Sequence, residues 1–168
     1  LLIGVGADLR YLTGYVAMPL ERLTMLVVGR TGPAVLVAPR LEAMAAAISP
    51  SGEAGLVEVL AWDETEDAHE LVASRLAALV GDAPAEARAL VSDTLWAMHV
   101  LGLQRAIPRP FGLATEVIRG IRMRKDADEI ALLRAAAHAA DRVMTAVASG
   151  PLIGRTEADV SREIAERL

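Results

Sequence analysis

Histidines are the first residues to consider, because an imidazole can bind a metal ion or transfer a proton near neutral pH. The sequence contains three of them, His69, His99 and His138. None has a second histidine two or four positions away, the spacing at which neighbouring side chains can share one metal ion. We therefore expect each histidine to lie alone on its predicted helix and to be structural.

Carboxylates and cysteines do not indicate a metal site either. Acidic pairs occur where helices are predicted to start, a place where the helix dipole favours negative charge; they are Glu64/Glu66, Asp126/Asp128 and Glu157/Asp159. The chain contains no cysteine. Thiolate metal sites, disulfide bonds and a cysteine nucleophile are therefore excluded.

Serine and glycine motifs of known catalytic folds are also missing. No serine lies in a Gly-x-Ser-x-Gly sequence, and Ser92-Asp93-Thr94 is expected to cap the helix that follows it. Gly4-Val5-Gly6 follows a predicted strand, but Leu9 occupies the place of the third glycine in a dinucleotide-binding fingerprint. The residues themselves predict no catalytic residue and no metal ligand in this chain.

The composition indicates a globular domain with an aliphatic core. Hydrophobic residues make up 54% of the 168 residues and aromatic residues 3%, which favours helices packed closely on a sheet. The net charge is -5 and Lys125 is the only lysine, so a basic surface for nucleic acid is not expected. No signal peptide or membrane-spanning apolar run is recognisable, and we expect a cytoplasmic protein.

Alternating strand and helix patterns predict the fold class. Strands are expected at 1–5, 23–29, 34–38, 56–61 and 89–91, and helices at 8–12, 40–48, 66–80 and 95–103. Arg30-Thr31-Gly32-Pro33 predicts a hairpin between the second and third strands. Ser49-Pro50-Ser51-Gly52 is expected to break the helix before it, and Pro108 and Pro110 to form an extended connection. The sequence thus predicts an α/β fold with a mixed sheet flanked by helices.

A different pattern begins near Arg119. Asp126 and Glu129 have the spacing of a capping box, and apolar residues then recur every three or four positions as far as Val147. Gly150-Pro151 is expected to end this long helix, and Thr156 to cap another. We predict one domain at 1–119, and a linker with the first two helices of a second domain at 120–168.

Three stretches of the sequence resemble the creatinase/prolidase family. Asp8-Leu9-Arg10-Tyr11-Leu12-Thr13-Gly14-Tyr15 is similar to the family's Asn-x-x-Tyr-Leu-Thr-Gly-Phe segment, with Asp8 and Tyr15 replacing Asn and Phe. The stretch from Arg122 to Ala136 resembles the Arg-x-x-Lys-x-x-x-Glu-Ile entry into the pita-bread catalytic domain. Gly154-Arg155-Thr156-Glu157 resembles the opening of that domain's next helix. The general resemblance is to the N-terminal domains of bacterial Xaa-Pro dipeptidases and aminopeptidases.

This resemblance implies a parent enzyme that cleaves the bond before proline in small peptides. It would use two divalent metal ions, such as manganese, cobalt or zinc, and the family's metal ligands all follow the helix that opens at Thr156. The portion in hand would then be non-catalytic. The family also implies a homodimer in which this domain walls the partner's active site, where Tyr11, Tyr15 and Arg22 are the candidates to reach substrate.

Other functions share these motifs. A creatinase-like hydrolase would carry the same three stretches, and a non-catalytic pita-bread protein would bind peptides or proteins without metal. A stand-alone α/β interaction domain fits less well, because residues 126–168 would expose an apolar stripe. The chain opens inside a predicted strand and stops inside a predicted helix, so we expect a fragment of a longer polypeptide. If it ended at Leu168, the segment 126–168 would be poorly packed, swapped or buried in an oligomer.

Overall fold

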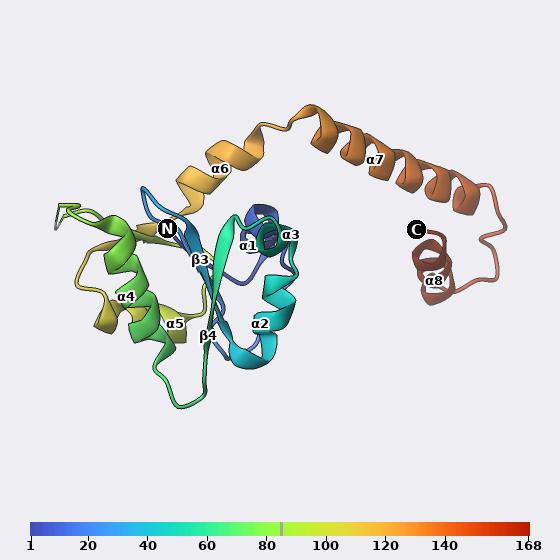
Figure 1. Ribbon diagram of the computed structural model, residues 1–168. Helices are drawn as coiled ribbons and strands as arrows, with labels where there is room; N and C mark the ends of the chain where they lie inside the picture. The colour runs from blue at the N-terminus through green and yellow to red at the C-terminus, as the bar shows by residue number, and fades with distance from the viewer. Residues whose placement is uncertain (85) are drawn as a thin grey trace. The chain divides into compact units, whose positions relative to one another are not determined.

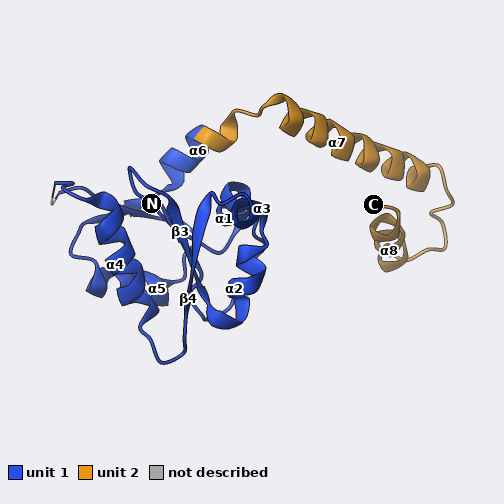
Figure 2. Ribbon diagram, in the orientation of Figure 1, with its two compact units in different colours: residues 1–120 blue, residues 121–168 orange. Residues whose placement is uncertain are grey.

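The computed structural model describes residues 1–84 and 86–168. These residues form two compact units, Leu1–Gly120 and Ile121–Leu168, which Figure 2 distinguishes by colour. Each unit is described by itself.

The first unit is built on a mixed sheet, as the alternating pattern predicts. Within the described ranges it has six strands in the order β4-β3-β2-β1-β5-β6. The strands are β1 (Leu2–Gly4), β2 (Met25–Val27), β3 (Ala34–Pro39), β4 (Val57–Trp62), β5 (Ala89–Val91) and β6 (Phe111–Leu113). Strand β2 runs antiparallel to both of its neighbours, β1 and β3, whereas the other adjacent strands are parallel.

Helices cover both faces of this sheet. They are α1 (Ala7–Thr13), α2 (Arg40–Ala47), α3 (Pro50–Glu53), α4 (Ala68–Val80), α5 (Ala97–Ala106) and α6 (Thr115–Met123). Figure 1 shows α4 and α5 on one side of the sheet and α1, α2 and α3 on the other. The core residues agree, because Val72 of α4 and Leu103 of α5 belong to one cluster and Leu9 of α1 and Ala46 of α2 to the other.

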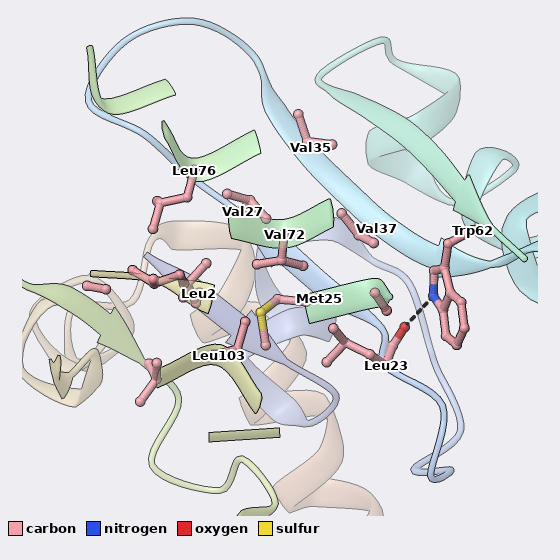
Figure 3. Close-up of a cluster of buried hydrophobic side chains, with 14 residues drawn as sticks. Leu2, Leu23, Met25, Val27, Val35, Val37, Trp62, Val72, Leu76 and Leu103 are labelled. Atoms are coloured by element: carbon pink, nitrogen blue, oxygen red, sulfur yellow. Dashed lines mark hydrogen bonds between the residues drawn. The ribbon is translucent and has the colours of Figure 1, made fainter. Parts of the chain in front are cut away.

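Side chains alternate between the two faces of the sheet along each strand, and this produces the two clusters. Leu2 and Ile3 are successive residues of β1 and point to opposite faces, because side chains alternate along a strand. The α4 and α5 side is filled by aliphatic side chains, many of which are labelled in Figure 3. Trp62 closes this cluster, and its indole N–H donates to the backbone oxygen of Leu23 at 2.9 Å. A buried polar atom of the indole is thereby satisfied.

The predicted hairpin is confirmed. Strands β2 and β3 pair in antiparallel register, with Met25 opposite Val37 and Val27 opposite Val35. Gly32 in the turn has φ 80°, a left-handed conformation that glycine adopts without steric cost. The turn residues therefore decide how these two strands meet.

The expected break after residue 48 is confirmed: α2 ends at Ala47, and a separate short helix, α3, follows it, capped by the Ser49 side chain, which accepts from the Gly52 N–H. The expected helix cap at Ser92-Asp93-Thr94 is corrected. Helix α5 has Trp96 at its N-cap and no side-chain cap. Ser92 instead accepts the N–H of Gly4 at 3.0 Å, so it joins the ends of β1 and β5 rather than capping a helix.

The second unit contains the long helix α7 (Ala127–Ala148) and helix α8 (Glu157–Arg167). Both start with a capping box, formed by Asp126 with Glu129 and by Thr156 with Asp159. Val143 and Val147 are buried within this unit, whereas Leu133 and Met144 are exposed. The two capping boxes confirm the helix starts predicted at Asp126 and Thr156.

Candidate functional site

The carboxyl ends of the parallel strands lie at one edge of the sheet. Strands β1, β3, β4, β5 and β6 all end there, and the antiparallel β2 begins there. The connection 14–24 must therefore cross this edge to enter β2. In open α/β sheets, ligands bind outside the carboxyl ends of the strands, so this edge is the candidate site.

Tyr15 is the second residue of this connection and belongs to the hydrophobic core. Its side chain is buried in the cluster of the α1 and α2 side. Its N–H donates to the Thr13 hydroxyl oxygen at 3.0 Å, and Gly14 has φ 71° in the turn between them. Burial, with a smaller contribution from Glu42, raises the pKa of the Tyr15 hydroxyl. Tyr11, on α1, is by contrast 40% exposed.

Arg22 lies near the other end of the connection 14–24 and forms ion pairs with two carboxylates. One guanidinium nitrogen, Nη2, contacts Glu42 Oε1 of α2 at 3.2 Å, and Nη1 contacts Glu64 Oε1 at 3.3 Å. Thr24 donates its hydroxyl to the other Glu42 oxygen at 3.4 Å. Arg22 Nε is buried and has no hydrogen-bond partner among the described residues. The side chain therefore fastens the connection to both α2 and the β4–α4 loop.

Two of the three histidines meet at this edge, contrary to the expectation that each would stand alone. His69 Nε2 of α4 lies 3.3 Å from His99 Nδ1 of α5. The contact is possible because Gly102, one turn further along α5, has no Cβ; an added Cβ would lie 2.6 Å from His69 Nε2. Because the two histidines are 30 residues apart in the sequence, helical spacing could not predict this pairing.

The surroundings of the histidine pair are polar on one side and aromatic on the other. Asp67 caps α4 and places Oδ1 3.5 Å from His69 Nδ1. The indole of Trp96 stacks on His99 with 6.3 Å between ring centroids. Burial, and then the neighbouring His69, lowers the pKa of the His99 imidazole.

An open hollow of about 380 Å³ lies over this pair. Glu21, Glu64, Glu66 and Asp67 contribute carboxylates to its lining, together with the two histidines. A second, smaller cavity of about 30 Å³ lies between Arg22 and the ring of Trp96. The candidate site therefore has four carboxylates and the histidine pair in its lining.

The described residues do not supply a metal centre. Nowhere in residues 1–84 and 86–168 do three or more histidine or acidic side chains converge in a way that could hold an ion. His138 lies on α7 in the second unit, where it is exposed. Among the described helices none is long and apolar enough to cross a membrane.

Comparison with known proteins identifies what this arrangement resembles. Residues 1–124 match the model of the creatinase/prolidase N-terminal domain. The chain is 42% identical over 168 residues to the probable dipeptidase PepE of Mycobacterium tuberculosis. The crystal structure of dipeptidase PepE from Mycobacterium ulcerans superposes on 99% of this chain with a TM-score of 0.85 and 39% identity. A dipeptidase structure from Pyrococcus horikoshii covers 99% of the chain with a TM-score of 0.83 and 26% identity.

These relatives are much longer than the chain. All 168 residues align, but they span only 43% of the mycobacterial dipeptidase and 43% and 44% of the two crystallised chains. The aligned part contains the mixed sheet, its helices and the two capped helices.

Proposed function

Because this chain belongs to the creatinase/prolidase family through its N-terminal domain, we propose that it forms the non-catalytic part of a proline-specific metallopeptidase. The intact protein would hydrolyse small Xaa-Pro peptides in the cytoplasm. The observation that carries this proposal is the 42% identity to a probable dipeptidase along the whole chain. The family supplies the further step from dipeptidase to a proline-specific enzyme.

The chemistry belongs to residues outside this chain. The described residues fit no metal ion, so the two divalent ions proposed for the family, manganese, cobalt or zinc, find no ligands here. A peptidase of this kind needs bound metal to generate its nucleophile near neutral pH. We therefore expect the 168-residue chain by itself to be inactive.

The contribution of this chain would be to shape the site from the edge of its sheet. Tyr11, Tyr15 and Arg22 are the proposed substrate-adjacent residues, acting across a homodimer. Their surroundings suggest different roles. Tyr11 offers an exposed side chain, Tyr15 anchors the start of the connection 14–24 in the core, and Arg22 binds its other end to Glu42 and Glu64. Exposed Val16 and Met18 lie between these supports.

The test is a hydrolysis assay on a full-length protein that contains this chain, loaded with manganese. We expect cleavage of a dipeptide such as Ala-Pro and little cleavage of Ala-Ala, measured as released amino acid. Chelation should abolish the activity, and metal should restore it. Equal cleavage of both peptides would contradict proline specificity and leave a general dipeptidase.

Tyr11, the exposed member of the three proposed residues, is tested in the same full-length protein. Tyr11→Ala should raise KM for the dipeptide if its side chain reaches substrate, and Glu116→Ala on α6 serves as a control at an exposed position of the same unit. Analytical ultracentrifugation should give the mass of a dimer.

No hydrolysis of any dipeptide, with metal present, would instead favour a creatinase-like hydrolase or a non-catalytic binding protein.

A further inference from the structure

The histidine pair connects two elements that are otherwise held by apolar contacts. His69 lies in the first turn of α4 and His99 in the first turn of α5. A neutral imidazole has one nitrogen that donates and one that accepts, whereas an imidazolium has two donors. At 3.3 Å, His69 Nε2 and His99 Nδ1 can share a hydrogen bond only if one of them accepts.

The pair can therefore keep its hydrogen bond with one added proton but not with two. When His69 is charged, Asp67 stands beside its Nδ1 and neutral His99 still accepts at Nδ1. When His99 is charged as well, two N–H groups and two positive charges face each other. No hydrogen bond survives in that state, and repulsion replaces it.

We propose that His69 and His99 form a proton-sensitive clasp that fastens the first turn of α4 to α5 at neutral pH and releases it in mild acid. Release would loosen the Asp67 cap and the first turn of α4. Asp63, at the other end of the loop 63–67, stays paired with Arg40, and Arg22 keeps its contact with Glu42. This inference is independent of the proposed peptidase activity.

The charges around the pair set the sign of the effect. Asp67 faces it from the α4 cap, Glu64 and Glu66 from the β4–α4 loop and Glu21 from the connection before β2. Negative charges near an imidazole favour its charged form. Arg22 lines the small cavity beside His99. The burial of His99, which is 6% exposed, and then the neighbouring His69 oppose its protonation.

The direction of the His99 shift gives the pH window. Its pKa is lowered in the folded chain, so the unfolded chain binds the proton more readily. The contribution of neutral His99 to the free energy of unfolding is then fully present above the ordinary histidine pKa of about 6.5. It falls as pH drops below that value and towards the folded pKa.

The experiment measures urea unfolding of the 168-residue chain at pH 7.5 and at pH 5.5. His99→Gln removes the titrating group but keeps an amide that can bond to His69, and His138→Gln on α7 is the matched control. We expect the wild type and His138→Gln to lose the same part of their urea midpoint in acid, and His99→Gln to lose clearly less. An equal loss in all three proteins would overturn the clasp.

A measurement on the unmodified chain guards against a variant that does not fold. Histidine ring signals followed by NMR from pH 8 to 5 should show His99 accepting its proton below the ordinary histidine pKa of about 6.5. Amide exchange in the first turn of α4 should accelerate with the His99 midpoint. If His99 titrates at or above about 6.5, or if α4 stays protected after His99 is charged, the proposal fails.

Discussion

At the scale of single residues, the absence of a side chain at Gly102 decides a contact. The His69 ring occupies the space where a Cβ of residue 102 would lie. Protein interiors are close-packed, so one added carbon there must displace the ring. A helix interior otherwise favours alanine over glycine, which makes Gly102 a position where packing overrides helix propensity.

Gly102→Ala is therefore expected to destabilise the first unit by about 1–3 kcal/mol, the cost of overpacking a filled site. Urea unfolding measures the change. Gly120→Ala on α6 is the matched control, because no atom lies within 4 Å of its added Cβ. That control should gain about 0.5–1 kcal/mol from a less flexible unfolded chain. A gain of similar size in both variants would show that the His69 ring moves aside without cost.

At the scale of elements, caps and ion pairs fix where segments begin and how they are held. Asp126 accepts the Glu129 N–H at 2.8 Å, and Glu129 accepts the Asp126 N–H at 3.0 Å. Both donors are among those that an α-helix leaves unpaired at its start. The box therefore sets the first residue of α7 from local sequence alone.

Asp126→Ala should cost about 1 kcal/mol of helix stability, because the Glu129 N–H loses its acceptor. Asp126→Asn retains an oxygen acceptor and should recover most of the loss. The readout is amide exchange in the first turn of α7, which should accelerate in the alanine variant. Unchanged protection in that variant would mean that the cap does not determine the start of α7.

The two carboxylates that bind Arg22 differ in exposure, so we expect them to contribute differently to stability. Glu42 is 19% exposed and also accepts from Thr24, whereas Glu64 is 71% exposed. Glu42→Gln should cost about 1–2 kcal/mol, since it weakens a partly buried charged hydrogen bond. Glu64→Gln should cost less than about 0.5 kcal/mol, as for other exposed pairs. Thermal and urea unfolding test this order, and a larger loss at Glu64 would contradict it.

At the scale of the whole molecule, both apolar clusters lie within the first unit. Their buried members extend from Leu2 to Ile118. A domain keeps its stability when residues outside its core are removed. A chain ending after Arg124, the last residue of the family match, should therefore unfold cooperatively. Its free energy of unfolding should lie within about 1 kcal/mol of that of the first unit in the full chain. A broad, non-cooperative transition would show that residues 125–168 are required.

The sequence by itself determined the features that depend on near neighbours. Short apolar runs placed five of the strands, Arg30-Thr31-Gly32-Pro33 placed the hairpin, and Asp126 and Thr156 placed the starts of α7 and α8. The family resemblance rests on equally local motifs, and the family match over residues 1–124 confirms it.

Only the tertiary structure decided which distant residues meet. Strand β6 has three residues and forms by pairing with β5, so its own sequence carries too weak a pattern to predict it. Arg22 finds Glu42 and Glu64 at separations of 20 and 42 residues, and His69 finds His99 at 30. Such contacts depend on how the sheet brings the ends of its strands to one edge. Periodicity and capping report only on residues within a few positions of each other, so they cannot reveal these pairs.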